Sequence, residues 1–341
     1  MISRRAFVSG FGGAMATAAL QPSIVLAQAG GKPLRITHAV TSLAYMQSYI
    51  ANQNGYFNQA GLTAQIIDTG GGGPDVQLVL GGRAEMTVND GAQILPALQQ
   101  GQKLTCVLSL LNRSIVNATI SKTAAAKYGV TEAMPLADKL GRMKGMKIGV
   151  TRPGALTWQL ARFNLVSVGL NPDKDAQIVA VGGPPALAAA LENGAVDLIY
   201  ISMPIGEKLI REGKAISFIN NARGEDPKLA NFMMEGLWTT PDYLAANRPT
   251  IKAAVTAYQK ASDFIRTSAP EAVVAALMPA LGSLGEAVLL DSVKRIHPAV
   301  SETGKITSAE FDTTQALLKM NGFLNTPFVI ADVFDGSFTK V

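Results

Sequence analysis

Residues 72–86 read GGPDVQLVLGGRAEM, and residues 182–198 read GGPPALAAALENGAVDL. In both stretches a glycine pair precedes proline, an apolar segment of helical length follows, and glycine and an acidic residue lead into the next apolar run. Proline is favoured at the first position of a helix, and glycine adopts the left-handed conformation that ends one. The repetition after about 110 residues predicts two similar lobes, although any strand–helix–strand unit can use glycine and proline in this way.

Apolar runs of strand length alternate with helical stretches from residue 34 to residue 219. Predicted strands are Leu34–Val40, Leu62–Thr69, Met86–Asn89, Leu104–Leu110, Ala118–Ser121, Lys147–Val150, Ala176–Val181, Leu198–Ile201 and Ile216–Ile219. Predicted helices between them are Ser42–Phe57, Pro74–Leu80, Ala92–Gln100, Leu156–Val168, Pro184–Glu192 and Pro204–Glu212. This alternation predicts an α/β fold with mostly parallel sheets flanked by helices. After about Pro227 only helices are predicted, as a C-terminal tail: Leu229–Met234, Pro241–Asn247, Pro249–Thr267, Glu271–Leu281, Leu284–Ile296 and Ser308–Met320.

Composition excludes several classes of protein. A chain of 341 residues with 48% hydrophobic and 16% charged residues is not disordered and has the length of about two domains. The net charge of +5 is small and dispersed, which argues against nucleic-acid binding. One cysteine, Cys106, excludes an intramolecular disulfide and a cysteine-based zinc site, and two histidines exclude a multi-histidine metal site.

The first residues are typical of an export signal. Arg4 and Arg5 form a twin-arginine pair, a weakly apolar stretch follows, and Ala27-Gln28-Ala29 fits a small-x-small cleavage pattern. We predict a twin-arginine signal peptide at 1–29, cleaved after Ala29, and a soluble periplasmic mature protein of net charge +3. The most apolar later window, 272–290, contains Pro279 and several further interruptions, so no membrane insertion of the mature chain is predicted.

Five stretches carry a family resemblance in their order and spacing. They are YIANQNGYFNQAGL at 49–62, LGGRAE at 80–85, KGMKIGV at 144–150, NGAVD at 193–197, and YLAANRP at 243–249 followed by AYQKA at 257–261. Together they cover roughly residues 33–275. In this arrangement the chain resembles the nitrate/sulfonate/taurine branch of the periplasmic substrate-binding proteins of ABC transporters, which includes binders of thiamine-pyrimidine precursors.

The resemblance implies a two-lobed periplasmic binding protein of type II. The first lobe is expected at 32–119 plus 222–341, and the second at 120–221. It also implies that a small-molecule ligand binds in the cleft between the lobes, that the lobes close by a hinge motion, and that permease subunits in the inner membrane recognise the closed form. Relatives of this kind are mostly monomers, and no cofactor is expected.

Physical reasoning places the ligand at the carboxyl ends of the strands, where helix N-termini offer free N–H groups. The candidate ligand-binding residues lie in turns of this kind or in segments that return to them: Ser42, Tyr45, Gly72, Gly73, Asn89, Asp90, Arg152, Gly154, Ala155, Thr157, Trp158, Gly183, Tyr200, Ser202 and Trp238. For several of these residues an ordinary structural role is the alternative. Ser42 and Asp90 are also typical helix N-caps, while Tyr45 and Trp158 are equally typical of a core.

The turn at 151–158 is the strongest candidate. The family usually has Gly-Ser here with a hydroxyl on the ligand, whereas this chain has Gly154-Ala155, so Thr157 or Thr151 would have to supply the hydroxyl. Arg152 could pair with a carboxylate or sulfonate, or it could be an ordinary surface arginine. We therefore expect a small anionic or planar ligand: a sulfonate, an aromatic carboxylate or a heteroaromatic compound. An aromatic ligand is expected only if tyrosine and tryptophan rings line the cleft.

Two alternatives to an importer subunit are an exported enzyme and a sensor that presents its ligand to a membrane receptor. The sequence contains no Gly-x-Ser-x-Gly elbow, P-loop or dinucleotide fingerprint. His38 lies in a predicted strand, His297 at a predicted helix end, and Cys106 in an apolar strand where it is expected to be inert. No catalytic residue is predicted. A sensor would bind its ligand by the same chemistry, so the sequence does not separate it from an importer subunit.

Overall fold

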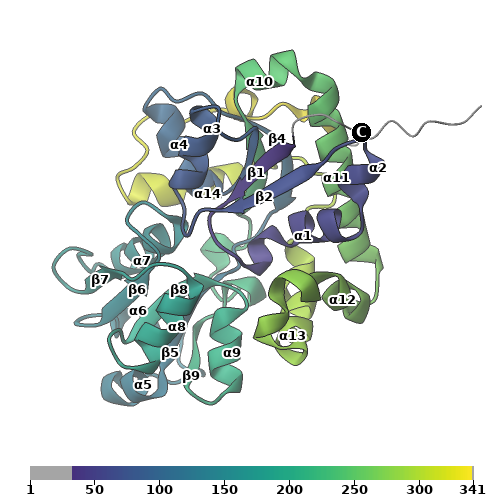
Figure 1. Cartoon of the computed structure of the whole chain (residues 1–341). Helices are drawn as coiled ribbons and strands as arrows, with labels where there is room; N and C mark the ends of the chain where they lie inside the picture. Colours follow the sequence, from purple (N-terminus) through teal and green to yellow (C-terminus); the bar gives the residue numbers. More distant parts are fainter. Residues whose placement is uncertain (1–32, 340–341) are drawn as a thin grey trace, which may run out of the picture. The chain divides into compact units, whose positions relative to one another are not determined.

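Two five-stranded sheets organise residues 33–339, which are the residues that the computed structural model describes (Figure 1). The first has the order β2-β1-β3-β10-β4, with bounds Ala64–Asp68, Leu34–His38, Met86–Asn89, Glu235–Thr239 and Thr105–Leu111. The second has the order β7-β6-β8-β5-β9, with bounds Gln177–Ala180, Lys147–Val150, Leu198–Ser202, Val116–Ser121 and Ala215–Ile219. The predicted signal peptide at 1–29 lies outside the described residues.

The two sheets have the same topology. In each, one strand runs against the other four: β10 lies antiparallel between β3 and β4, and β5 lies antiparallel between β8 and β9. The remaining neighbours are parallel. The repeated GGP stretches occupy equivalent places, since one leads from β2 to β3 and the other from β7 to β8. The predicted two-lobed α/β fold is confirmed, with each sheet mixed by a single reversed strand.

The reversed strands also show where the chain passes between the sheets. β4 ends at Leu111 and β5 begins at Val116, so the first crossing is residues 112–115. The predicted boundary at 119/120 falls inside β5, which pairs with β8 along its length, and the boundary therefore belongs at the crossing. The second crossing, residues 220–234, runs from β9 to β10 and contains the predicted boundary at 221/222.

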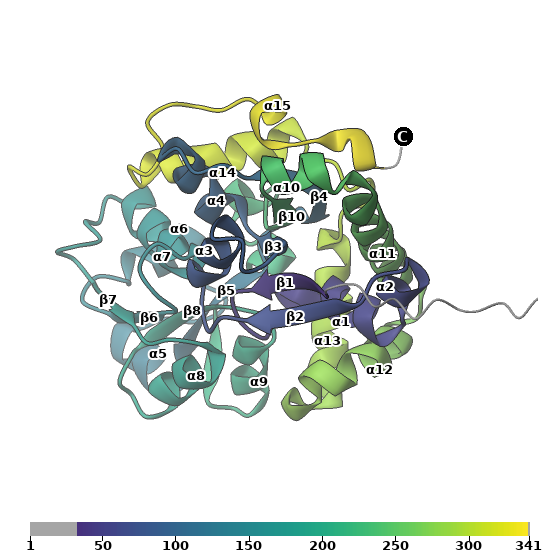
Figure 2. The ribbon, with the colours of Figure 1, turned by 45° about the horizontal axis from the view of Figure 1, so that its top comes forward.

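Helices cover both sheets and build the C-terminal part of the chain. Their bounds are α1 Met46–Gln53, α2 Tyr56–Gln59, α3 Pro74–Leu80, α4 Gly91–Gln99, α5 Lys122–Tyr128, α6 Leu136–Gly141, α7 Leu156–Ser167, α8 Pro184–Glu192, α9 Ile205–Arg211, α10 Pro241–Ala246, α11 Arg248–Thr267, α12 Pro270–Leu281, α13 Glu286–Ile296, α14 Ser308–Met320 and α15 Ile330–Val333. Short 3₁₀ helices occur at Leu43–Tyr45, Asn221–Arg223, Pro227–Leu229, Gly282–Leu284, His297–Ala299 and Gly336–Phe338. In Figure 2, α14 lies beside α4, and it also contacts α7 of the other lobe. Within residues 33–339 no helix has both the length and the apolar character of a bilayer span.

One predicted helix is wrong, and one strand was missed. The predicted helix Leu229–Met234 is instead the end of a 3₁₀ turn followed by irregular chain, and Glu235–Thr239 after it forms β10. This strand is buried throughout its length. Gly236 permits its close packing, because a Cβ atom there would approach the Cys106 Sγ atom to 2.8 Å. The segment EGLWT at 235–239 is no continuous apolar run, since it begins with Glu235 and Gly236, and its pairing with β3 and β4 defines the strand.

Candidate ligand-binding site

A cavity of about 40 Å³ lies between the two lobes, at the carboxyl ends of strands from both sheets. Strands β1, β3, β6 and β8 end at or beside it, and helices α4 and α7 begin beside it. This is where open α/β sheets bind ligands. The lining residues are Ala39, Val40, Tyr45, Gly72, Asp90, Gln93, Val116, Thr151, Ala155, Leu156, Thr157, Ile201, Ser202, Met234 and Glu235.

The structure brings part of the predicted set to this cavity. The predicted residues that line it are Tyr45, Gly72, Asp90, Ala155, Thr157 and Ser202. The predicted residues outside its lining are Ser42, Gly73, Asn89, Arg152, Gly154, Trp158, Gly183, Tyr200 and Trp238. That any of these residues binds a ligand stays a prediction.

The aromatic residues outside the lining have structural contacts of their own. Trp238 is fully buried, and its Nε1–H donates to the Asn89 carbonyl at 2.9 Å. Tyr200 is also fully buried in the core. Trp158 packs against Phe323, with ring centroids 5.3 Å apart. Of the three rings on which an aromatic ligand was predicted, Tyr45 alone borders this cavity in the described chain.

Ser42 and Asp90 both act as helix caps. The Ser42 hydroxyl accepts a hydrogen bond from the Ala44 N–H at 3.1 Å, which confirms the plain capping alternative for this residue. Asp90 caps α4, because its Oδ1 atom accepts from the Gln93 N–H at 2.8 Å. Asp90 differs from Ser42 in that it also lines the cavity.

A buried polar network supports the first-lobe wall. Asp75, which the sequence analysis did not single out, accepts hydrogen bonds from the Gly73 N–H at 2.6 Å and from the Asn89 side-chain amide at 2.7 Å. The Asn89 side-chain oxygen accepts in turn from the Gln93 amide at 2.8 Å and from the Asp90 N–H at 2.9 Å. Asn89 therefore positions the residues that line the cavity, without lining it itself.

Close approach explains two glycines of the run at 70–73, namely Gly71 and Gly72. A Cβ atom on Gly71 would lie 2.6 Å from the Arg152 guanidinium, and one on Gly72 would collide with the Gln93 side chain. The guanidinium of Arg152 thus packs over the glycine backbone. Burial raises the pKa of the neighbouring Asp75, and the charge of Arg152 opposes this effect without reversing it. Arg152 is not among the residues that line the cavity.

Glu235 is the charged lining residue that was not among the predicted site residues. It begins β10 at a register irregularity between Glu235 and Gly236, a feature that re-aims side chains in sheets. The residue is 4% exposed, and its Oε2 atom has no hydrogen-bond partner among the described residues. The sequence signal for a site residue here was an acidic residue three positions before Trp238, in the segment that returns to the first lobe.

The electrostatics of the cavity are acidic. Burial raises the pKa of Asp90 to about 7, and the nearby Asp75 adds to this effect. Burial, followed by the charges of Asp90 and Asp75, raises the pKa of Glu235 well above its ordinary value. Among the cavity-lining residues of the described chain there is no lysine, arginine or histidine.

A second cavity of about 360 Å³ also lies between the lobes and shares Val40 with the first. Its lining combines loops of the first lobe, the start of α8 and the region around α12: Val40, Thr41, Asp68, Gly70, Gly183, Pro184, Pro185, Ile205, Ala280, Leu281, Ser283 and Leu284. Its charged lining residue is Asp68, so this cavity is acidic as well. Hydrogen bonds from His38 and Thr41 lower the pKa of Asp68, although burial opposes them.

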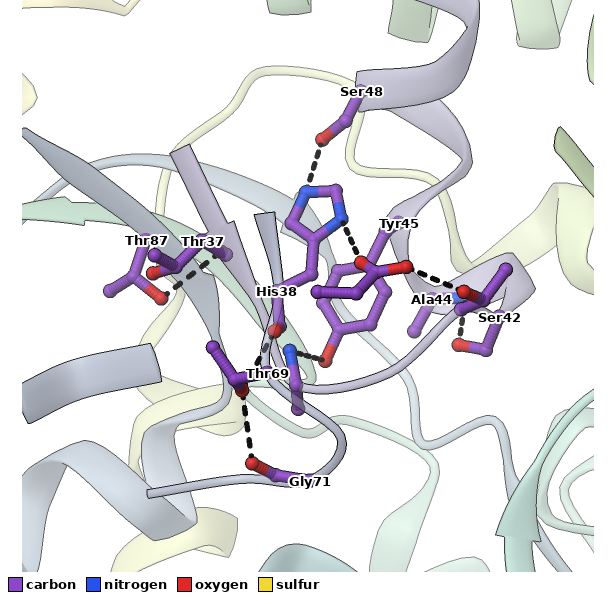
Figure 3. A network of polar contacts seen from close by, with 12 residues as sticks. Thr37, His38, Ser42, Ala44, Tyr45, Ser48, Thr69, Gly71 and Thr87 are labelled. Carbon is purple, nitrogen blue, oxygen red and sulfur yellow. Dashed lines mark hydrogen bonds and ion pairs between the residues drawn. The ribbon is translucent and has the colours of Figure 1, made fainter. Parts of the chain in front are cut away.

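Ser48, His38 and Asp68 have the order of a catalytic triad. The His38 Nε2 atom lies 2.9 Å from the Ser48 hydroxyl, and its Nδ1 atom lies 3.5 Å from Asp68 (Figure 3). However, Ser48 and His38 are fully buried, and the Ser48 hydroxyl also contacts the Tyr258 hydroxyl at 2.8 Å. The ring of His38 stacks on Tyr45 at 4.3 Å, and burial lowers its pKa. This cluster ties α1, β1 and α11 together, and its serine is not accessible to a substrate.

No group of three or more His, Cys, Asp or Glu side chains in residues 33–339 is placed to hold a metal ion. Cys106 is buried, and burial raises the pKa of its thiol to about 12. A thiol of this kind is a poor nucleophile. The chemistry that the cavities offer is therefore recognition by carboxylates, hydroxyls and apolar side chains.

Known structures share the fold at low sequence identity. A protein from Bordetella bronchiseptica RB50 is 22% identical, with a TM-score of 0.78 over 90% of this chain and 95% of that one. The alkanesulfonate-binding protein SsuA from Xanthomonas axonopodis pv. citri, bound to MOPS, is 17% identical, with a TM-score of 0.70 over 89% of this chain and 98% of that one. The desulfurization enzyme DszB is 18% identical, with a TM-score of 0.57 over 90% of this chain and 97% of that one.

No curated protein matches the sequence. A family model described as NMT1/THI5 like matches residues 43–272, which is well over half of the chain. The resemblance drawn from the sequence is thereby confirmed: the chain belongs to the NMT1/THI5 like family.

Proposed function

We propose that this chain is the solute-binding component of an ABC importer, and that it captures a small molecule between its two lobes and delivers it to permease subunits. The cavity between the lobes carries this proposal, because both sheets supply its walls at their carboxyl ends. Family membership and the fold shared with an alkanesulfonate-binding protein support it. We further propose that the protein acts in the periplasm as a monomer, that the segment 1–29 directs its export by the twin-arginine pathway, and that it binds no nucleic acid.

Hinge motion between the lobes follows from the size of the cavity. The share of liquid volume of one water molecule is about 30 Å³, so a cavity of about 40 Å³ does not admit a solute of several heavy atoms. The lobes must separate for such a solute to enter this cavity, whereas the second inter-lobe cavity of about 360 Å³ is large enough for one. The two crossings at 112–115 and 220–234 are the connections about which they would turn.

An enzyme on the same fold is the second candidate, because DszB has this fold. The arrangement in this chain favours binding. The triad-like cluster of Ser48, His38 and Asp68 is inaccessible to a substrate, because Ser48 and His38 are fully buried. The two inter-lobe cavities are lined by no cysteine and no histidine of the described residues. A ligand-presenting sensor would use the same cleft, and it is distinguished by co-purification with a receptor in place of a permease.

The proposal is tested by thermal melting of the purified protein with a panel of sulfonates, carboxylates, amines, nitrate and pyrimidines. A ligand at 100 times its Kd stabilises the folded state by about 2.7 kcal/mol, which raises the melting temperature by a few degrees. The expected result is a rise with one chemical class, with the compound recovered unchanged by mass spectrometry. Recovery of a chemically altered compound would overturn the proposal in favour of the enzyme.

A further inference from the structure

We infer that the ligand presents a positively charged nitrogen, of the ammonium or amidinium type, to Asp90 and Glu235. The inference rests on the proposed solute-binding function and specifies the class of solute. It departs from the anionic part of the anionic or planar ligand that the sequence predicts, for which Arg152 was the candidate partner.

Glu235 is the first observation. Its side chain lines the cavity and is almost fully buried, yet its Oε2 atom has no hydrogen-bond donor among the described residues. A buried carboxylate without a partner is costly, and such groups are normally paired or hydrogen-bonded. A donor that enters the cavity would supply the missing partner.

Asp90 is the second observation, since it brings another carboxylate to the same cavity from a different element. Glu235 begins β10, and Asp90 precedes α4. The Asp90 Oδ1 atom accepts from the Gln93 N–H in capping α4, and the residue also lines the cavity. Two carboxylates on one wall match a nitrogen that carries several N–H donors, because charge-assisted hydrogen bonds are the strongest of their kind.

The charges of the lining disfavour an anion. The guanidinium of Arg152 lies over Gly71 beside Asp75, and Arg152 is not among the lining residues. No basic side chain of the described residues lines the cavity. A sulfonate or carboxylate there would meet two acidic side chains and no basic side chain among the lining residues of the described chain.

The remaining walls indicate an organic cation and not a metal ion. They are largely apolar, with Val40, Leu156, Ile201 and Met234 among the lining residues. A divalent metal prefers a shell of oxygen ligands, and the described residues offer no group of three acidic or other ligating side chains. Thr157 and Ser202 also line the cavity, and their hydroxyls offer hydrogen bonds to one further polar group of the solute.

Matched pairs of probes test the inference by isothermal titration calorimetry. Benzamidine and n-butylamine are the cations, and benzoate and butane-1-sulfonate are anions of similar shape. We expect the cations to bind and the anions not to bind. Binding of the anions in place of the cations would overturn the inference and leave the proposed function standing, as would failure of both cations when another compound of the wider panel binds.

A charge-removing variant makes the test specific. In Glu235→Gln we expect cation affinity to fall about tenfold or more, because a hydrogen bond to a charged group is lost. The control is Glu310→Gln in α14, which removes a similarly buried carboxylate with an unpartnered Oε2 atom that does not line the cavity. Thermal melting verifies that both variants fold. Equal cation affinity in Glu235→Gln and the control contradicts the inference.

Discussion

Glu235 and Asp90 are two carboxylates that the fold keeps away from water on one wall of a cavity. Their raised pKa values have a shared cause, since burial disfavours the charged form and each carboxylate faces further negative charge. The groups known to face them are Asp75 and Tyr45, with Arg152 acting on Asp75. At the scale of single residues, the site is therefore a pair of acids whose pKa values burial raises, and a positive partner would favour their ionised forms.

This arrangement predicts that cation binding is linked to proton release. At pH 6 the free protein holds a proton on Asp90, whose pKa is raised to about 7, and a bound cation favours the deprotonated form. Affinity for benzamidine should therefore rise with pH, by about tenfold between pH 6 and pH 8 for one proton. Titrations in buffers of different ionisation enthalpy measure the protons released. An affinity that is constant or falls over this range contradicts the prediction.

β10 is the element on which the site depends most. It enters the first sheet between β3 and β4, carries Glu235 at its start and buries Trp238 near its end. The Trp238 Nε1–H donates to the Asn89 carbonyl, so the strand is tied to the end of β3 from which Asp90 follows. The position of the site is thus set by long-range pairing and not by a local turn.

Replacing Trp238 with Phe should destabilise the protein by about 2–4 kcal/mol, because it removes this hydrogen bond and leaves a cavity in a fully buried position. The measurement is the free energy of unfolding in urea. The matched control is Trp158→Phe, at a partly exposed tryptophan packed on Phe323, for which less than about 1 kcal/mol is expected. Equal losses in the two variants contradict the role assigned to Trp238.

Elements whose ends are marked locally could be predicted from the sequence. Helices Pro74–Leu80 and Pro184–Glu192 occur with the predicted bounds, because proline opens each of them and the residues that end them follow directly. β10 could not be predicted, since neighbouring strands define it. The site residues differ in the same way, since some are marked by local sequence and others depend on long-range pairing. Asp90 and Thr157 follow from turns at strand ends, whereas Glu235 reaches the cavity only through the placement of β10.

At the scale of the whole described chain, two topologically equivalent lobes are joined by two crossings. They share two cavities, and the one lined by Asp90 and Glu235 is too small for an organic solute. Both crossings connect the sheets through β4, β5, β9 and β10, while β2 and β7 form the opposite edges. A hinge at the crossings moves these far edges most. Solute capture by closure is therefore best observed between β2 and β7.

The most direct test is the distance distribution between spin labels at Gln65→Cys in β2 and Gln177→Cys in β7, measured by double electron–electron resonance. Both positions are exposed, and the native Cys106 is buried away from the label. We predict a broad or long distance distribution without solute, and a shorter, narrower one when a cation that binds by calorimetry is added. A distribution that does not change on addition of a bound solute would contradict capture between the lobes.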